Sequence, residues 1–374
     1  MIYLDSAATT YPKPQNVYAS VSDALRRYSF NSGRGGYRQS VDAAEKIFDV
    51  RIKLAEMFNC SEQNIAFTNN CTTAVNTAVR GLAKKGSHIL ISSLEHNAVW
   101  RTVCCLREDG ISDFDIVEYS SDTEKFLNNI KEKEKSNTSM VVMLHASNVF
   151  GVVTPIKAIG DYCRQKGWYY IVDAAQSAGV LPIDMKDCGI SVLCAPGHKG
   201  LYGIMGSGFL ALSDSILPAP LTCGGTGSNS ADWRQPDDLP DRLEAGTLNN
   251  PGIISIGAGV DFINRKGIDT IFHHEMRLIE FMYKELEKTE GISLYAPFEQ
   301  IKAPVLSFNV GDYHSEEAAS RLAERQIAVR AGLHCAPLAH NSFKTSNRGS
   351  VRVSPCAFTT FHDCEYFLNS VKNM

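Results

Sequence analysis

Several kinds of pattern are missing from this 374-residue sequence, and each absence excludes a class of protein. There is no run of about 20 apolar residues, so we expect no membrane-spanning helix. The formal net charge is only −4, which gives no reason to expect nucleic acid or an anionic membrane as a partner. The chain opens with an expected strand, Ile2 to Leu4, that lacks the shape of a signal peptide.

The eleven cysteines have no pattern of their own. Their number is odd and none shows the C-x-x-C spacing of zinc sites, so we expect neither a disulfide framework nor a bound metal. Most of them are expected to be small buried hydrophobic residues. Unpaired cysteines are typical of a reducing compartment, and we therefore predict a cytoplasmic protein.

What the sequence does contain is the composition of a soluble globular protein, 44% hydrophobic and 21% charged. Its length allows roughly two domains, each with its own core. The run from Asn249 to Gly252 contains Pro and Gly, which interrupt regular structure. We predict a large domain over residues 15–250 and a smaller α+β domain formed by residues 1–14 and 251–374.

Strands alternate with helices through the predicted large domain. Residues 42–58 carry apolar side chains at the i, i+3, i+4 spacing of a core-facing helix. Short apolar runs typical of buried strands lie at residues 64–67, 88–91, 140–144, 169–172, 192–195 and 208–212. This alternation predicts an α/β fold with a mainly parallel, doubly wound sheet.

Two of these runs end next to residues that could bind a cofactor or take part in catalysis. Asp173 follows the strand that begins at Tyr169, and Lys199 comes soon after the strand that ends at Ala195. Open α/β sheets bind ligands at the carboxyl ends of their strands. A lysine can hold an aldehyde cofactor as a Schiff base, while a carboxylate keeps a pyridine nitrogen protonated. The alternative is a capping Asp and a solvated Lys, which are common.

The segments Val-Asp-Ala-Ala-Gln-Ser and Gly-His-Lys-Gly-Leu-Tyr-Gly, which contain Asp173 and Lys199, resemble the cofactor-binding core of the class V aminotransferase family. Within it, the chain is most similar to the branch of cysteine desulfurases and selenocysteine lyases. The similarity runs from Tyr3 to Arg352. It implies a pyridoxal phosphate (PLP)-dependent transferase of fold type I, whose large domain has a mainly parallel seven-stranded sheet.

The resemblance also implies which residues bind PLP. Lys199 would carry the cofactor, Asp173 would pair with the ring nitrogen, and His96 would stack on the ring and shuttle protons. Asn148 would hydrogen-bond the oxygen on the cofactor ring, and Gln176 would also bind the cofactor. The phosphate would be held by further polar side chains, namely Thr72, Thr73, His198 and, from the partner subunit of a homodimer, Thr247. For the two adjacent threonines, ordinary helix capping is the alternative.

A second set of residues would act on the substrate. Cys335 lies beside His334 and near Arg330, where a thiolate is favoured, and it aligns with the persulfide-forming cysteine of the family. Arg352 matches the arginine that binds the substrate carboxylate, a task suited to its planar fork. The resemblance adds Asn148 to the substrate site, and Arg34, which would reach into the neighbouring subunit.

The chain departs from the family pattern at three positions. Pro196 stands where relatives often have a phosphate-binding serine, and proline has neither a hydroxyl nor an amide hydrogen. Leu333 replaces a polar residue before His-Cys, and Cys356 has no counterpart.

Three functional hypotheses follow from these residues. The first is a desulfurase that converts L-cysteine to L-alanine and passes sulfur through Cys335 to an acceptor protein. The second keeps PLP but assigns a selenocysteine lyase, another C–S lyase or an aminotransferase, for which Cys335 is dispensable. The third is a doubly wound binding module without catalysis.

Overall fold

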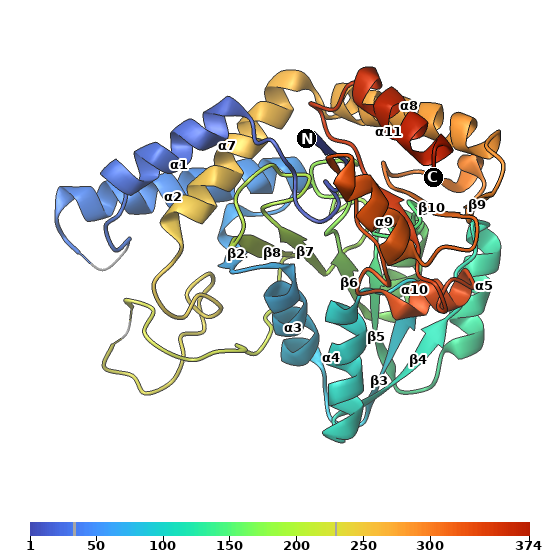
Figure 1. The fold of residues 1–374 in the computed structure, drawn as a ribbon. Coiled ribbons are helices and arrows are strands. Elements are labelled where there is room, and N and C mark those ends of the chain that lie inside the picture. Colours follow the sequence, from blue (N-terminus) through green and yellow to red (C-terminus); the bar gives the residue numbers. More distant parts are fainter. Residues whose placement is uncertain (33–34, 229) are drawn as a thin grey trace.

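A computed structural model of the chain describes residues 1–32, 35–228 and 230–374. Its centre is a seven-stranded sheet whose order in space is β2-β8-β7-β6-β5-β3-β4 (Figure 1). Strand β8 runs antiparallel to both of its neighbours, and the other pairs are parallel. In spatial order the strands are β2 (Ile65–Thr68), β8 (Gly208–Leu212), β7 (Val192–Pro196), β6 (Tyr169–Asp173), β5 (Thr138–Leu144), β3 (Ser87–Ser92) and β4 (Ser112–Val117).

Helices cover both faces of this sheet, as a mainly parallel sheet requires. Side chains alternate along each strand: in β2, Ile65 and Phe67 pack on one face while Ala66 packs on the other. The first face is covered by α2 (Arg38–Phe58), α5 (Thr123–Lys133), α6 (Ile156–Lys166) and α7 (Asn250–Lys266). The second face is covered by α3 (Cys71–Leu82) and α4 (Asn97–Glu108). The predicted α/β fold with a mainly parallel seven-stranded sheet is therefore confirmed.

One strand of the sheet was missed in the sequence. Strand β4 has the sequence Ser-Asp-Phe-Asp-Ile-Val, in which polar and apolar residues are mixed. It lies at an edge, paired only with β3, so several of its side chains stay in contact with solvent. An edge strand of this kind lacks the continuous apolar run by which the six others were found.

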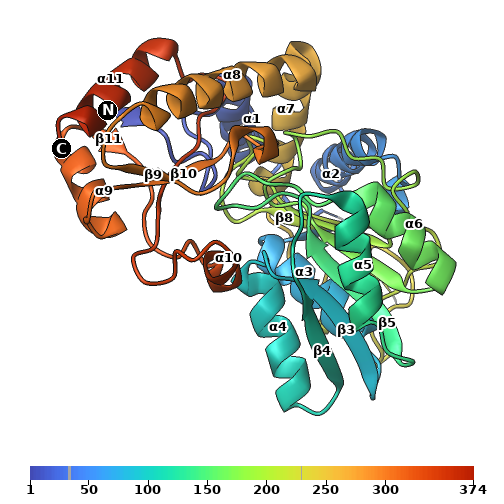
Figure 2. The same ribbon diagram turned by 90° about the vertical axis from the view of Figure 1, so that its right-hand side faces the viewer.

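A second group of elements surrounds a three-stranded antiparallel sheet with β10 between β12 and β9. The N-terminal strand β1 forms a separate, two-stranded parallel sheet with β11 in the same group, and Figure 2 shows both chain ends beside α9 and α11. The elements are β1 (Ile2–Tyr3), α8 (Ile268–Glu287), β9 (Ile292–Leu294), β10 (Leu306–Val310), α9 (Ser315–Glu324), β11 (Ile327–Ala328), α10 (Pro337–Ser342), β12 (Val351–Val353) and α11 (Phe361–Lys372). The remaining elements are helix α1 (Gln15–Arg27) and the 3-10 helices η1 (Glu62–Asn64) and η2 (Phe298–Gln300).

Helix α7 lies between these two groups. It packs against α1 and α2, with which it forms the elongated end of the molecule in Figure 1. Several of its side chains, among them Ile253, Ile256 and Val260, belong to the core of the large sheet. The division into two domains near residue 250 stays a prediction.

Candidate active site

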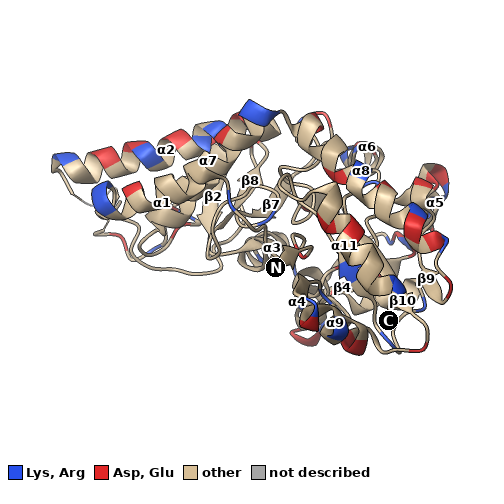
Figure 3. Ribbon diagram, turned by 45° about the horizontal axis from the view of Figure 1, so that its top comes forward, with Lys and Arg blue, Asp and Glu red and all other residues tan. Residues whose placement is uncertain are grey.

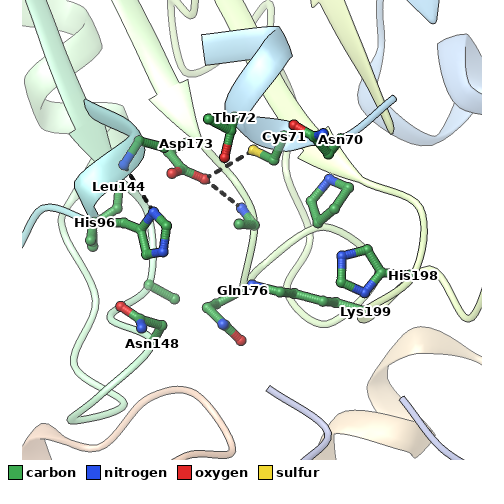
Figure 4. A pocket seen from close by; sticks show the side chains of 14 residues that line it. Asn70, Cys71, Thr72, His96, Leu144, Asn148, Asp173, Gln176, His198 and Lys199 are labelled. Carbon is green, nitrogen blue, oxygen red and sulfur yellow. Dashed lines mark hydrogen bonds between the residues drawn. The ribbon is translucent and has the colours of Figure 1, made fainter. Parts of the chain in front are cut away.

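The carboxyl ends of β6 and β7 bring together the two residues on which the sequence interpretation depends. Asp173 ends β6 and pairs in register with Leu144 of β5 and Cys194 of β7. Lys199 follows the end of β7 by three residues. Both side chains line one cavity of about 110 Å³ (Figure 4). The cavity is lined by Asn70, Cys71, Thr72, His96, Ala98, Leu144, Ala146, Asn148, Asp173, Ala175, Gln176, Pro196, His198 and Lys199.

The Asp173 carboxylate is oriented through one of its oxygens. Its Oδ1 accepts a hydrogen bond from the Ala175 amide at 2.9 Å and another from the Cys71 thiol at 3.4 Å. The side chain is buried, and its Oδ2 has no hydrogen-bond partner in the described residues. One oxygen is thus fixed by the protein, while the other is free for a donor in the cavity.

The Lys199 amine is poised to be neutral more readily than an ordinary lysine. Burial lowers its pKa, because removing an ammonium group from water disfavours the charged form. The nearby Asp173 carboxylate acts in the opposite direction and limits this shift. A neutral amine is the form that attacks a carbonyl, so the environment favours the nucleophilic state.

His96 is held in one tautomer by the start of α4. Its Nδ1 accepts a hydrogen bond from the Ala98 amide at 3.0 Å and thereby caps the helix. Burial lowers the pKa of the ring, so it is neutral at neutral pH. Because Nδ1 is an acceptor, the proton of the neutral ring is on Nε2.

The start of α3 forms another wall of the cavity. Asn70 caps the helix by accepting from the Thr73 amide at 2.8 Å. Asn70, Cys71 and Thr72 line the cavity, and the first amides of a helix are a natural anion site. Thr73 instead lines a neighbouring cavity of about 100 Å³ together with Thr247. The phosphate contacts assigned to Thr73 and Thr247 stay predictions.

Two buried polar atoms in this region lack partners. In the parts of the chain that are described, neither Asn148 Oδ1 nor His198 Nδ1 has a hydrogen bond. Burial lowers the pKa of His198 to about 4, so its ring is neutral. Unsatisfied buried polar atoms carry a free-energy cost, and a bound polar ligand would remove it.

Asn148 connects the cavity to the second group of elements. Its carbonyl accepts from Arg352 Nη1 at 2.8 Å, and its side-chain amide donates to the His334 carbonyl, also at 2.8 Å. Arg352 is buried and forms an ion pair with Asp5 at 2.6 Å. Its Nε has no hydrogen-bond partner in the described residues. Arg352 therefore lies beside the cavity with one donor unused.

Cys335 does not line the cavity of Lys199. It is exposed and lines an adjoining cavity of about 290 Å³, which shares His96, Thr72 and Ala98 with the first. Its carbonyl accepts from the Asn97 amide at 2.7 Å. Both His334 and Cys335 have left-handed backbone conformations, with φ of 51° and 56°. Such conformations are uncommon for residues other than glycine and mark a tightly specified turn.

The neighbours of Cys335 differ from the expectation in one respect. The His334 ring is buried, stacks on His340 and interacts with its Nε2 at 3.3 Å. Burial strongly lowers the pKa of His334, so it carries no positive charge near neutral pH. A neutral His334 ring cannot favour the thiolate through positive charge, and the thiolate state of Cys335 stays a prediction.

The structure also brings in residues that the sequence interpretation missed. Cys71 contacts Asp173, and Asp5 holds Arg352. Lys13, whose pKa burial lowers to about 8, donates to the His198 carbonyl at 2.8 Å. Asp5 lies within the range from Tyr3 to Arg352 over which the chain resembles the family, and this resemblance was the available signal. No sequence pattern indicated Cys71 or Lys13. Their partners, Asp173 and His198, are 102 and 185 residues away in the sequence.

Three other predictions concern absences or residues outside this view. Arg34 lies outside the described residues. In the described chain, no group of three or more His, Cys, Asp or Glu side chains is arranged to hold a metal ion. Among the helices of the described ranges, none combines the length and apolar character needed to cross a membrane.

Comparisons with known proteins agree with this geometry. The sequence model of the aminotransferase class-V family matches residues 2–367. A probable cysteine desulfurase from Methanothermobacter thermautotrophicus is 33% identical over 371 residues, which cover 97% of this chain and 92% of the relative. A cysteine desulfurase from Haloferax volcanii is 29% identical, with 91% and 82% covered. The apo structure of a cysteine desulfurase from Thermococcus onnurineus superposes with a TM-score of 0.92 at 28% identity, covering 100% and 94%.

Proposed function

Because the chain belongs to the class-V aminotransferase family, we propose that it is a PLP-dependent cysteine desulfurase. It would convert L-cysteine to L-alanine and transfer the sulfur to Cys335 for delivery to an acceptor. The observation that carries this proposal is the presence of Lys199, Asp173 and His96 in one cavity, with Cys335 in the cavity next to it.

The residues present fit PLP. Asp173 Oδ2 is free to accept a hydrogen bond from a ring nitrogen. Asn148 Oδ1 and His198 Nδ1, which have no hydrogen-bond partner in the described residues, could bond to polar atoms of the cofactor. The N-terminus of α3 is suited to binding its phosphate. Gln176 and Thr72 line the same cavity. When bound, PLP supplies an electron-withdrawing ring that stabilises negative charge on the substrate Cα.

The side chains divide the remaining work. Lys199, with its lowered pKa, would hold the cofactor and, once released by the substrate amine, would move the Cα proton. His96, neutral with its proton on Nε2, would assist as a second proton carrier. Arg352, held next to Asn148 by the Asn148 carbonyl and by Asp5, would orient the substrate carboxylate together with Asn148.

Cys335 would take the sulfur as a nucleophile. Its thiolate attacks the substrate sulfur, the S–Cβ bond breaks, and its electron pair stays with the carbon that is later protonated to form alanine. The product on the enzyme is a persulfide. Attack requires the two sulfurs to approach to about 3–3.5 Å. Since Cys335 lies in the outer cavity, its turn has to move toward His96 for this step.

A homodimer with shared sites is part of this proposal. Large hydrophobic side chains are exposed along α1 and α2, including Leu25 at 60% and Phe48 at 43%. Trp233, at 92%, and Met205, at 68%, are exposed as well. Acidic and basic residues alternate along α2 (Figure 3). Exposed hydrophobic side chains mixed with charges of both signs suit a protein partner better than a ligand whose charges all have the same sign. A second copy that covers this surface could place Thr247 and Arg34 at the other subunit's phosphate and substrate.

The unpaired state of the described cysteines supports a reducing compartment, and we propose the cytoplasm. The alternative reaction is that of a selenocysteine lyase, or of another C–S lyase or aminotransferase, which would not need Cys335.

The decisive test is the release of alanine and sulfide from L-cysteine by the wild type and by Cys335→Ser. We expect the variant to bind PLP normally and to lose about 100-fold or more of the activity, because its hydroxyl is a far poorer nucleophile for sulfur. Cys105→Ser is the matched control, since Cys105 lines the same outer cavity and should be dispensable. Full activity of Cys335→Ser would favour the alternative reaction, and a protein that never takes up PLP would refute both.

A further inference from the structure

The outer cavity beside Cys335 has a chemistry of its own. It is lined by two helices, with Thr72, Asn76 and Arg80 from α3 and Ala98, Arg101, Thr102 and Cys105 from α4. Cys335 and His96 lie among the residues that line it. Cys335 is exposed and lines this cavity but not the inner one, so a molecule bound in the outer cavity lies next to its side chain.

The charge of this cavity has one sign. Arg80 and Arg101 line it, and no aspartate or glutamate does. Arg101 is exposed, and in the described residues it has neither an ion pair nor a hydrogen bond. Arg80 is partly engaged: its Nη1 lies 3.7 Å from Asp109 Oδ2, and its Nε donates to Asn76 Oδ1 at 3.3 Å. The N-termini of α3 and α4 lie at its inner end, and the positive ends of their dipoles add to the field.

We infer that this cavity binds the acceptor of the Cys335 sulfur, and that the acceptor is a small thiol that carries carboxylate groups. The inference rests on the proposed function, which supplies the persulfide. The volume of about 290 Å³ is close to the lower end of small-molecule sites. The carboxylates would bind Arg101 and Arg80, while the thiol faces Cys335.

The reaction is a balanced sulfur exchange. The acceptor thiolate attacks the outer sulfur of the Cys335 persulfide, a new S–S bond forms, and the old one breaks. Cys335 leaves as a thiolate, and the acceptor becomes a persulfide, with no net oxidation. The two arginines would assist this step in two ways. Their positive charge favours the thiolate form of the acceptor, and it reduces the electrostatic repulsion between that thiolate and an anionic persulfide.

The test separates charge recognition from the chemistry. Enzyme with PLP is treated with one equivalent of L-cysteine, and the persulfide on Cys335 is followed by intact-protein mass while a thiol removes it. The probes are mercaptosuccinate, with two carboxylates, and the neutral 2-mercaptoethanol. The quantity compared is the second-order rate constant of mercaptosuccinate divided by that of 2-mercaptoethanol, each corrected for thiol pKa. We expect this ratio to fall by about fivefold in Arg101→Ala and further in Arg101→Ala/Arg80→Ala. Added salt should lower the wild-type ratio.

Arg107→Ala is the control, because it removes the same charge from α4 outside the cavity, where Arg107 binds Asp113 at 2.6 Å. It should leave the ratio unchanged. Alanine formation in the first turnover should be the same in all variants, which shows that they fold and that the proposed function holds. An unchanged ratio in the double variant, with normal persulfide formation, would overturn the inference alone.

A peptide distinguishes a small acceptor from a protein acceptor. A blocked pentapeptide with one cysteine between glutamates carries the same groups on a longer chain. If only the peptide depended on the two arginines, the site would serve an acidic protein segment and the small-thiol assignment would be wrong. If no persulfide formed on the wild type, the proposed function would fail and the inference with it.

Discussion

The inner cavity of Lys199 and the outer cavity of Cys335 adjoin, yet the protein builds them in different ways. Asp173 is a strand residue paired on both sides, with Leu144 and with Cys194. Cys335 lies on a left-handed turn, where the Asn97 amide binds its carbonyl. A strand thus places Asp173, which we propose binds the cofactor ring, whereas a turn places Cys335, which we propose transfers the sulfur. Many ladder hydrogen bonds therefore fix the position of Asp173, while local backbone geometry fixes that of Cys335.

Replacing Lys199 would break the inner region most severely. In Lys199→Ala we expect loss of all detectable turnover and of covalent PLP attachment, because among the described residues no other lysine lines that cavity. Borohydride trapping followed by mass measurement of the protein checks the attachment. Lys13→Ala is the matched control, a nearby lysine with a lowered pKa that should keep the adduct. A trapped adduct in Lys199→Ala would contradict the assignment.

Asn148→Ala would weaken the connection between the two regions. The change removes the hydrogen bond from its amide to the His334 carbonyl and leaves that buried acceptor unpaired. We expect kcat/KM for L-cysteine to fall about tenfold, with faster alkylation of Cys335 as its turn loosens. Asn76→Ala, which changes the outer cavity alone, should leave kcat/KM within about twofold. An unchanged alkylation rate in Asn148→Ala would show that the turn does not depend on this contact.

The folding stability of the protein should depend on pH through a buried carboxyl group beside Lys199. Glu275 lines a cavity of about 30 Å³ with Lys199, and burial raises its pKa to about 8 from an ordinary 4.5. Between these values the folded protein binds a proton that the unfolded chain has lost, so this stabilising contribution decreases as pH rises toward 8. The slope is about 1.4 kcal/mol per pH unit.

Glu275→Gln should remove this part of the pH dependence, as measured by denaturant unfolding at intervals from pH 5 to 8. Glu280→Gln, on the same helix and paired with Lys284 at 2.6 Å, should keep the wild-type slope. Burial also raises the pKa of Glu95 to about 8, so some slope should remain. Equal slopes for the two variants would mean that Glu275 is ionised in the folded protein.

The smallest effect is expected at Cys71. Burial raises the pKa of its thiol, so it remains a donor to Asp173 Oδ1 at neutral pH. Cys71→Ala removes this donor and should weaken PLP binding about threefold, while Cys71→Ser, which keeps a donor, should bind like the wild type. Titration of the apoprotein with PLP gives the affinity without relying on turnover. Equal affinities for the Ala and Ser variants would exclude an orienting role for the thiol.

Much of the inner region could be predicted from local sequence. Strand ends in a parallel sheet meet at one edge, so Asp173 and Lys199 were expected together once their apolar strands were recognised. The edge strand β4 escaped because its exposed side chains break the apolar pattern. The outer region was less predictable. That His334 is buried and neutral depends on His340 and on packing that no motif encodes.

The sequence by itself determined the α/β class, the family and the identity of the residues that could carry the chemistry, because strand periodicity and motifs are local properties. Only the tertiary structure decided that Cys335 lines a different cavity from Lys199, that Thr73 lines neither of these two cavities, and that Cys71 contacts Asp173. The physical reason is distance along the chain. Contacts between residues many positions apart depend on how helices and turns pack over the sheet, and that packing is a property of the whole fold.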